Sequence, residues 1–495
     1  KPNERVYEQG RVMGGGSSIN VQAANRGLPR DYDEWAQAGA SGWDWEGVLP
    51  YFRKLERDLN CQGPLHGNDG PVPIRRILPA DFPAYGAAVS EALSKSGLSM
   101  RLDQNGDFED GLFPPAFSNE ADRRVSTAVA YLTNAVGQRP NLTIWQESRV
   151  IRLCTEGAHI SAVEILRNSG MVKVHSRRVV LAAGALQTPA LLLRAGIGDA
   201  QHLKALGIAV VCNRVGVGKN LQDHPALTLA QYLPRRLRLP ASYRRASFVA
   251  MRYSSGSHEA GPSDMYVTAS ARAGWHALGE RLGLYFMWCN RPFSRGQLQL
   301  TSPDVDIHPQ VELGLLSDQR DVVRMMDMVR RISQLVITDV INANPQDLFA
   351  AAFTPRIKKL STVSAANALM NHVIGTMLDV PAPIRNWVLK TFMLQGNSLP
   401  DILGNDNMLE EFVRRQVFGV WHASGTCRMG SPSDELAVVD STGKVIGINN
   451  LYVSDASIMP RLPTANTNIP VIMIAEKISE GLLRESLQNG MRTVG

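Results

Sequence analysis

Residues 179–185 constrain the fold more than any other part of the chain. They read Val-Val-Leu-Ala-Ala-Gly-Ala, an apolar run that ends in small residues. Such a run is typical of a buried strand, and small residues at its end suit the edge of a dinucleotide site in an open α/β sheet. The apolar stretch that starts here is broken at Gly184 and Pro189 and stops at Arg194. Because it is shorter than the ~18 residues of a membrane span, we expect a buried strand, a turn and a helix.

Length and composition favour a globular protein of two domains. A chain of 495 residues is long for one hydrophobic core. Its hydrophobic content of 44% and charged content of 20% are ordinary for soluble proteins. The net charge of +6 is too modest and diffuse to indicate nucleic acid as a partner. The five cysteines form no Cys-x-x-Cys pair, so we expect no metal site and no disulfide framework, and reduced thiols favour a cytoplasmic location.

The spacing of apolar residues predicts the main elements. Helices are expected over 43–58, 85–96, 200–206 (capped by Asp199), 320–337 and 472–483. Strands are expected over 141–153, 160–166, 172–183, 284–288 and 297–301. From about residue 226 the alternating pattern indicates a second sheet.

Two local features leave alternatives open. The arginines of the 235–245 segment would attract an anionic substrate or a membrane surface, or, as we favour, form a solvated loop. The Met-rich stretch 365–394 would form a lid, an oligomer interface or a membrane contact, although plain helical packing is the leading interpretation.

Four motifs follow one another along the chain. Residues 10–20 read GRVMGGGSSIN, 184–198 read GALQTPALLLRAGIG, 420–430 read VWHASGTCRMG, and 463–470 read PTANTNIP. Together they resemble the glucose–methanol–choline (GMC) family of flavin-dependent alcohol oxidoreductases. The resemblance spans most of the chain. It implies a mixed α/β fold with a Rossmann-like FAD-binding domain and a substrate domain built from a mainly antiparallel sheet and helices.

The resemblance also implies interleaved domains. We expect an FAD-binding domain over 1–75, 118–225 and 418–495, and a substrate-binding domain over 76–117 and 226–417. Family members open with a Gly-x-Gly-x-x-Gly fingerprint in a βαβ unit, and no such motif follows a strand here. We therefore expect that this N-terminal segment is absent from the sequence, and that a chain starting at Lys1 holds FAD poorly.

The same resemblance implies which residues contact the cofactor. In some relatives a histidine tethers the flavin, and Ile19 stands in its place here, so noncovalent FAD is expected. Val150 would hold the adenine side through its backbone, or else belong to the core. The residues expected at FAD are Arg11, Gly14, Gly15, Ser18, Asn20, Val21, Gln22, Ala23, Val150, Ala183, Gly184, Trp421, Asp455, Ala456, Thr467 and Asn468.

The two C-terminal motifs supply the candidate catalytic residues. Oxidising an alcohol removes the hydroxyl proton and a hydride from the neighbouring carbon, which requires a proton acceptor. The resemblance makes His422 that base, since a neutral imidazole with a pKa near ~6.5 suits the task. It makes Asn466, rather than Asn468, the amide that touches the same substrate oxygen. His224, in the segment Gln-Asp-His-Pro, is interpreted as structural.

We therefore predict FAD-dependent oxidation of a primary alcohol, aromatic or choline-like, to the aldehyde, with hydride transfer to flavin N5 and O2 or a quinone as electron acceptor. The alternatives are a non-redox hydroxynitrile lyase, a light-driven fatty-acid decarboxylase and an inactive truncated fragment. A serine hydrolase is disfavoured because no Gly-x-Ser-x-Gly elbow occurs. The sequence leaves the particular alcohol and the oligomeric state open.

Overall fold

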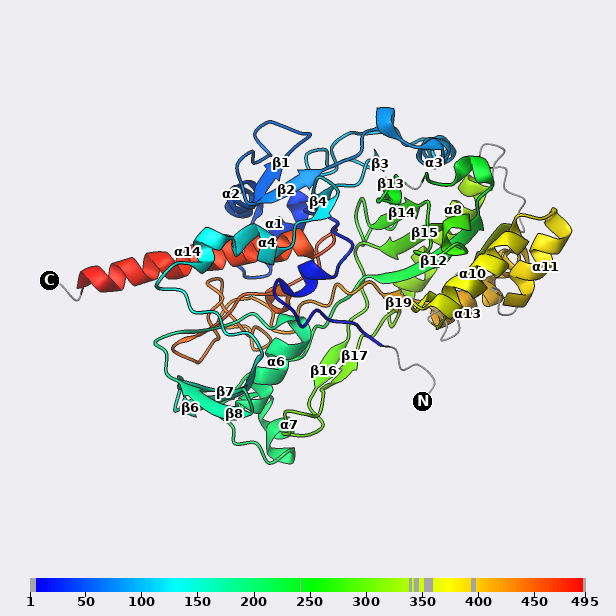
Figure 1. The fold of residues 1–495 in the computed structure, drawn as a ribbon. Helices are drawn as coiled ribbons and strands as arrows, with labels where there is room; N and C mark the ends of the chain where they lie inside the picture. The colour runs from blue at the N-terminus through cyan, green and yellow to red at the C-terminus, as the bar shows by residue number, and fades with distance from the viewer. Residues whose placement is uncertain are drawn as a thin grey trace.

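The computed structural model describes residues 6–240, 242–337, 341, 347–350, 359–392 and 398–492. Two large hydrophobic cores contain most of its buried apolar side chains. The first core uses residues from the start, middle and end of the chain, and the second uses mostly the large green sheet and its helices in Figure 1. Leu298 and Leu300 of the middle segment pack in the first core, and the domain boundaries stay a prediction.

The largest sheet has seven strands, and every pairing in it is antiparallel. It contains β3 (Gly111–Phe113), β12 (Pro225–Tyr232), β13 (Ser247–Tyr253), β14 (Met265–Ser270), β15 (Leu282–Cys289), β18 (Leu348–Ala350) and β19 (Phe418–Gly419). The order is β18-β12-β15-β14-β13-β3, with β19 paired to the start of β12. Side chains alternate between faces, so Leu227 and Leu229 enter the second core while Ala226 lies among aromatic rings on the other face.

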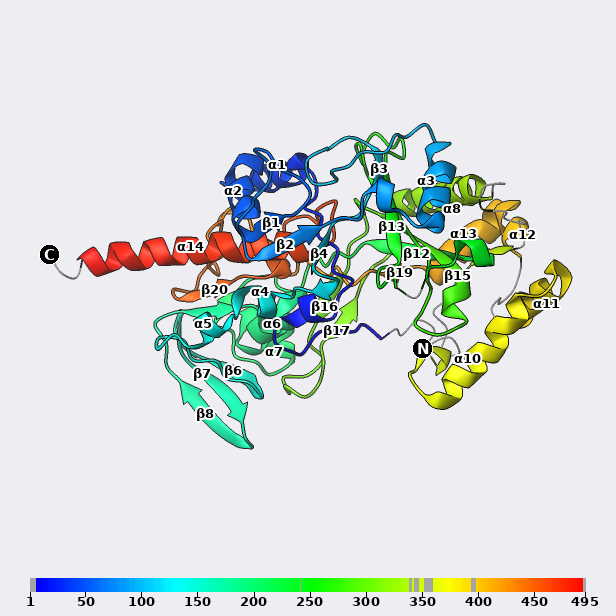
Figure 2. The same ribbon diagram turned by 45° about the horizontal axis from the view of Figure 1, so that its top comes forward.

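Helices cover the second core. They are α3 (Ala84–Ser94), α8 (Gln319–Val336), α12 (Leu399–Leu403) and α13 (Asp406–Gln416). At the same end of the molecule lie α10 (Ala365–Leu378) and α11 (Ala382–Phe392), which pack against each other (Figure 2). This pair leaves several apolar side chains exposed, among them Leu369, Met370, Val373, Ile384 and Trp387. Residues 393 and 394 of the Met-rich stretch lie outside the described residues.

The first core is built on helices and short strands. Its helices are α1 (Pro29–Gln37), α2 (Trp45–Leu55), α4 (Thr127–Tyr131), α6 (Gly184–Arg194) and α14 (Asn468–Arg492). Strand β9 (Val179–Leu181) pairs in parallel with β20 (Leu451–Val453), which joins segments far apart in the sequence. The far half of α14 extends away from the rest of the described chain (Figures 1 and 2).

A separate antiparallel sheet contains β6 (Ser148–Glu156), β7 (His159–Arg167) and β8 (Gly170–Val174). Asn168 and Ser169 both have positive φ, 48° and 61°, which is the geometry of a tight two-residue hairpin turn. The single strand predicted over 172–183 is wrong. It divides into β8 and β9, which pair in different sheets.

Short elements complete the fold. They are α5 (Asn134–Gly137), α7 (Ala200–Ala205), the sheet of β1 (Glu56–Asp58), β2 (Val72–Arg75), β4 (Phe117–Glu120) and β5 (Arg123–Arg124), the pairs β10 (Ile197–Gly198) with β11 (Cys212–Asn213) and β16 (Gln297–Gln299) with β17 (Gln310–Glu312), and 3-10 turns at Gly15–Ser18, Pro79–Asp81, Arg235–Leu237, Gly279–Arg281 and Ala456–Ile458.

The predicted elements are mostly confirmed, with two corrections. The strand expected over 141–153 begins only at Ser148. The run expected to be a buried strand is a strand over Val179–Leu181 alone, and Val180 is 43% exposed. Helices form at α2, α3, α7 and α8, and the Asp199 carboxylate caps α7 by accepting the Gln201 N–H at 2.9 Å. The last helix begins at Asn468 rather than 472. The arginine segment is only partly a solvated loop, because Arg238 pairs with Asp379 and Arg245 stacks over Phe117. The predicted mixed α/β class is confirmed. Among the described residues, no helix combines the length and the hydropathy needed to cross a bilayer.

Candidate active site

The structure brings the two predicted catalytic residues together. His422 follows β19, and Asn466 lies just before α14. The Asn466 amide Nδ2 lies 3.1 Å from His422 Nε2 although the residues are 44 positions apart. The backbone N–H of Asn466 donates to Asn25 Oδ1 at 3.1 Å, which fixes the loop that carries it. A ring nitrogen and an amide therefore converge on one point.

A second histidine contacts the first. His224 Nδ1 lies 2.8 Å from His422 Nδ1, with the two rings nearly perpendicular at 89°. The other ring nitrogen of His224, Nε2, lies 3.0 Å from the backbone carbonyl of Asn290. His224 is fully buried and His422 is 8% exposed. Sequence reasoning interpreted His224 as structural, and the contact with His422 is what that reasoning missed.

Asp223 holds the backbone around His422. Its Oδ1 accepts the N–H groups of His422 at 3.0 Å and Val420 at 3.2 Å. Its Oδ2 accepts the Tyr7 hydroxyl at 2.9 Å, and the Tyr7 oxygen in turn accepts the Ala423 N–H at 3.1 Å. Burial raises the pKa of Asp223 to about 7. The motif of residues 420–430 is thus anchored to the segment that precedes β12.

Both histidines are held in their neutral form. Burial lowers the pKa of His422 well below its ordinary value, and the neighbouring His224 lowers it further. Burial also lowers the pKa of His224 to about 3. A neutral imidazole has one bare nitrogen, so His422 is available at neutral pH as a proton acceptor.

The loop before Asn466 is tied to α1. Asp31 Oδ2 accepts three hydrogen bonds, from the Leu28 N–H at 2.8 Å, the Thr464 N–H at 2.9 Å and the Thr464 hydroxyl at 2.6 Å. Gln222 Oε1 accepts the Leu462 N–H at 3.1 Å. This loop therefore depends on both the N-terminal helix and the segment beside His224.

The first predicted cofactor segment forms a compact turn with accessible backbone. Gly14 and Gly15 have positive φ, 86° and 53°, and a Cβ added to Gly15 would meet nothing within 4 Å. Asn20 Oδ1 accepts the Gln22 N–H at 2.9 Å. The predicted residues here that are exposed or half-buried are Arg11, Gly14, Gly15, Ser18, Asn20, Val21, Gln22 and Ala23.

The predicted cofactor residues Ala183 and Gly184 lie beside Asp455, which follows the end of β20. Asp455 Oδ2 accepts the Gly184 N–H at 2.9 Å and the Thr188 hydroxyl at 2.6 Å, and Oδ1 accepts the Ser457 N–H at 2.8 Å. Protein donors engage both carboxylate oxygens, so Asp455 positions the loop with its side chain. Ala183, which precedes α6, is exposed.

The remaining predicted cofactor residues are spread more widely. Thr467 and Asn468 open α14, whose first-turn N–H groups have no partner within the helix and give that end a partial positive charge. Ala456 accepts the Gly425 N–H at 3.0 Å. Val150 lies on β6 in the separate three-stranded sheet.

Comparison with known proteins identifies the family. The sequence profile described as GMC oxidoreductase matches residues 2–226 with its N-terminal part, and 292–378 and 390–475 with its C-terminal part. The chain belongs to the GMC oxidoreductase family. GMC oxidoreductases bind FAD, and this protein is an FAD-dependent oxidoreductase that acts on CH–OH groups.

Named relatives of this GMC oxidoreductase are enzymes. The chain is 43% identical to 5-(hydroxymethyl)furfural oxidase of Methylovorus sp. (strain MP688), over 97% of this chain and 84% of that protein. It is 31% identical to the mitochondrial choline dehydrogenase of Homo sapiens, over 96% of this chain and 75% of that protein. Among solved structures, pyridoxine 4-oxidase from Mesorbium loti superposes with a TM-score of 0.78 at 26% identity, covering 96% of this chain and 84% of that one.

The residues present in this GMC oxidoreductase fit FAD. A flavin needs apolar surface for its rings and accessible N–H groups for its polar edge and phosphates. A Cβ added to Gly184, like one at Gly15, would meet nothing within 4 Å. Exposed apolar side chains lie in or beside the predicted cofactor segments, namely Val12, Met13, Ile19, Val21, Val180 and Trp421.

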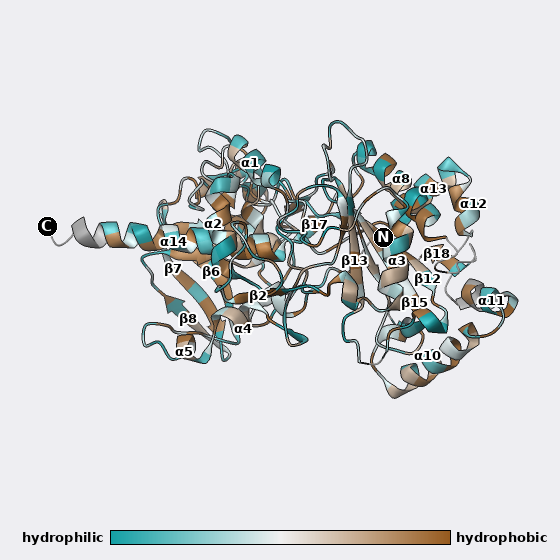
Figure 3. Cartoon of the chain, turned by 90° about the horizontal axis from the view of Figure 1, so that it is seen from above, coloured by the Kyte–Doolittle hydropathy of each residue, from teal (hydrophilic) through white to brown (hydrophobic). Residues whose placement is uncertain are grey.

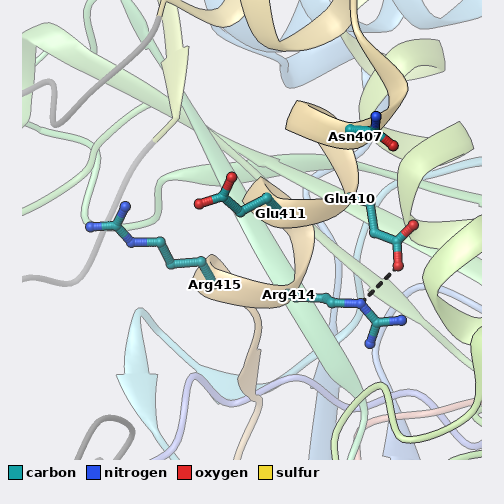
Figure 4. Close-up of a pocket in the computed structure, with 5 residues that line it drawn as sticks. All are labelled: Asn407, Glu410, Glu411, Arg414 and Arg415. Carbon is teal, nitrogen blue, oxygen red and sulfur yellow. Dashed lines mark hydrogen bonds and ion pairs between the residues drawn. The ribbon is translucent and has the colours of Figure 1, made fainter.

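A surface hollow of about 490 Å³ lies elsewhere, along α13. It is lined by Asn407, Glu410, Glu411, Arg414 and Arg415 (Figure 4). All five belong to one helix, and Glu410 pairs with Arg414 at 2.9 Å. The hollow contains none of the predicted catalytic or cofactor residues.

A buried ionic cluster joins β1 to the following loop. Ligand atoms of Asp58, Cys61 and His66 lie within 4.8 Å of one another, a spacing compatible with a metal ion. However, Arg76 donates to both Asp58 oxygens, at 2.8 and 2.7 Å. Burial lowers the pKa of His66, but hydrogen bonds to Asp103 and Asp58 outweigh it and raise the pKa to about 10. Two cationic side chains therefore already neutralise the carboxylates, and we interpret the cluster as an ion network.

Proposed function

We propose that this GMC oxidoreductase oxidises a primary aromatic alcohol to the aldehyde, with His422 as the base. The observation that carries the proposal is the convergence of His422 Nε2 and Asn466 Nδ2, 3.1 Å apart. A substrate hydroxyl placed between them donates its proton to the ring nitrogen and accepts a hydrogen bond from the amide. One preorganised donor of this kind is worth about 10²–10³ in rate.

When bound, FAD supplies the hydride acceptor, N5 of the flavin ring. His422 holds the proton that the hydroxyl loses, and Asn466 orients the substrate oxygen. We propose noncovalent FAD because Ile19 offers no nucleophilic atom for a tether, and O2 as the electron acceptor because the relative with 43% identity is named an oxidase. We also propose the interleaved domains over 1–75, 118–225 and 418–495, and over 76–117 and 226–417.

Aromatic side chains beside the histidines favour a flat substrate. The Trp288 ring centroid lies 6.5 Å from His224 and 5.6 Å from Phe286. Phe286 contacts Phe418 at 5.5 Å, and Phe418 contacts Trp421 at 6.2 Å. Aromatic rings pair favourably with one another. The names of two relatives, a hydroxymethylfurfural oxidase and a pyridoxine oxidase, support the same substrate class.

The test is an anaerobic reduction of the flavoprotein. Benzylic, furfuryl, aliphatic and choline-type alcohols are mixed with it, and the absorbance of oxidised flavin is followed. We expect the benzylic or furfuryl alcohols to bleach the flavin, and readmitted oxygen to restore it. Bleaching by choline alone would overturn the aromatic substrate. Cleavage of a cyanohydrin without bleaching by any alcohol would replace the oxidase proposal with a lyase.

A variant pair isolates the base. His422→Ala should lower the rate of bleaching by at least about 10²-fold, since general base catalysis contributes about 10²–10⁴. His308→Ala is the matched control, because His308 is an exposed histidine outside the proposed site. Equal rates in the two variants would exclude His422 as the base.

A further inference from the structure

The contacts of His224 determine which of its nitrogens carries the proton. A backbone carbonyl only accepts hydrogen bonds, so the Nε2 that lies 3.0 Å from the Asn290 carbonyl must bear the hydrogen. Burial keeps the His224 ring neutral, and a neutral imidazole bears a single N–H. The Nδ1 of His224 is therefore bare and acts as an acceptor.

The bare Nδ1 of His224 in turn determines which nitrogen of His422 carries the proton. His422 Nδ1 lies 2.8 Å from the bare Nδ1 of His224, so His422 Nδ1 must bear the hydrogen. The Nε2 of the neutral His422 ring is then bare. This agrees with its other contact, since the Asn466 amide at 3.1 Å donates to it. The hydrogen bonds run in one direction, from Asn466 through both rings to the Asn290 carbonyl.

We propose that His224 is a positioning residue that fixes the tautomer of His422, so that a bare Nε2 faces the substrate hydroxyl. The proposal deepens the proposed function and rests on His422 as the base. In the reaction the alcohol O–H bond breaks and its proton forms a bond to Nε2. Bound FAD would supply the acceptor for the hydride of the alcohol carbon, so that the C–O single bond becomes the aldehyde double bond. His422 is left as an imidazolium whose Nδ1–H still points at His224.

The partner is neutral, which distinguishes it from a carboxylate in the same place. A carboxylate would fix the tautomer and raise the pKa of the histidine. His224 fixes the tautomer without carrying a charge, and burial lowers the pKa of His422. The titratable group on the backbone side of His422 is Asp223, whose carboxylate accepts the His422 N–H and the Tyr7 hydroxyl. The ring of His422 is oriented by His224 and its backbone by Asp223.

The test compares His224→Asn with His224→Leu, two side chains of nearly equal shape. The Asn amide oxygen accepts the His422 Nδ1–H, and Leu does not. The flavoprotein is labelled with ¹⁵N-histidine, and the ring nitrogens of His422 are assigned by their loss in His422→Ala. We expect the Nδ1-protonated tautomer in the wild type and in His224→Asn, and a substantial Nε2-protonated population in His224→Leu.

Kinetics with the alcohol that bleaches the flavin give a second readout. The value of kcat/KM should fall by about 10²–10⁴ in His224→Leu, because a wrong tautomer costs up to about 10⁴ in a comparable site, and by less than about tenfold in His224→Asn. An Nε2-protonated His422 in the wild type would overturn the proposal. Equal losses of kcat/KM in His224→Leu and His224→Asn, with the tautomer of His422 unchanged in both, would also overturn it.

The wild-type spectrum and the Asn variant keep the test valid even where the Leu variant fails to fold. The outcomes also separate the two proposals. An Nδ1-protonated His422 in a flavoprotein that no alcohol reduces would leave the His224 assignment standing and remove the proposed function. Alcohol oxidation by a protein whose His422 is protonated at Nε2 would leave the proposed function standing and remove the His224 assignment.

Discussion

Asp223 and His224 are neighbours in the sequence, yet they hold different parts of His422. Asp223 accepts the backbone N–H, and His224 contacts the ring. Trp421, which lies between Val420 and His422, adopts a left-handed φ of 59°. This conformation costs free energy for any residue with a bulky side chain. Asp223 accepts the N–H groups of Val420 and His422, on either side of Trp421. These hydrogen bonds offset the cost and fix the position of His422.

Asp223 makes the stability of the protein depend on pH. Burial raises its pKa to about 7, above the ~3.9 of an unfolded chain. Folding therefore favours the protonated carboxyl. Its contribution to the free energy of unfolding is fully present below pH ~3.9 and is lost as the pH rises through 7. In Asp223→Asn this loss should disappear.

Urea unfolding of the wild type and Asp223→Asn at pH 5 and pH 8 measures the effect. The wild type should lose more stability than the variant between these two values. Other titrating groups are common to both proteins, so they cancel in the difference. An equal loss in both would show that Asp223 is not the titrating group.

At the residue scale, sequence patterns found the proposed base and its amide but not the partner ring. His422 and Asn466 lie in long motifs that resemble the family. His224 also lies in a motif typical of the family, but its partner is 198 positions away. A contact over that distance arises only when β19 pairs with β12, and no local pattern reports that pairing.

At the element scale, α1 holds the loop that carries Asn466. The buried Asp31 carboxylate accepts two hydrogen bonds from Thr464 and one from Leu28. Asp31→Ala would leave these donors unpaired in a buried place, at a cost of about 1–3 kcal/mol for each buried group. We expect lower stability and a fall in kcat, because the amide of Asn466 would no longer be fixed.

Asp31→Asn is the matched variant, since its amide oxygen still accepts hydrogen bonds at the same place. It should retain more activity and stability than Asp31→Ala in thermal unfolding and steady-state assays. Equal behaviour of the two variants would mean that the hydrogen bonds of Asp31 do not control the loop.

Periodicity predicted the long elements and failed at short or charged ones. Helix α8 has the apolar repeat of a packed helix and forms where expected. Strand β1 reads Glu-Arg-Asp and was missed, because its buried charges are paired with Arg26 and Arg76 rather than replaced by apolar side chains. The gap between β8 and β9 was missed since both flanking runs are apolar.

At the scale of the whole molecule, ion pairs connect the two cores. Arg291 follows the large sheet, is buried, and donates to both oxygens of Glu34 on α1 at 2.6 and 2.9 Å. The Arg291 carbonyl accepts a hydrogen bond from Arg324 on α8 at 2.9 Å. These contacts tie α1 of the first core to α8 of the second. The two helices lie in different halves of the molecule in Figure 3.

Arg291→Met should separate the unfolding of the two cores. Glu34 is half-buried and keeps its ion pair with Arg461, so the loss should stay below the about 3–5 kcal/mol of a fully buried pair. The change falls at the connection between the cores. Scanning calorimetry of the flavoprotein should show a broadened or split transition. Arg320→Met is the control, since that arginine is 46% exposed and its pairs contribute little. An unsplit, unshifted transition in Arg291→Met would contradict the coupling.

The contact of His422 with His224, which lies just before β12, has a practical consequence for enzyme engineering. Asp223 and His224 precede that strand, whereas Phe286 lies opposite Thr228, further along it. Under the proposed function, proton transfer and substrate fit are thus encoded by separate stretches of backbone. A mutant library directed at Phe286 can therefore search for new substrates while Asp223, His224 and His422 stay unchanged in every member.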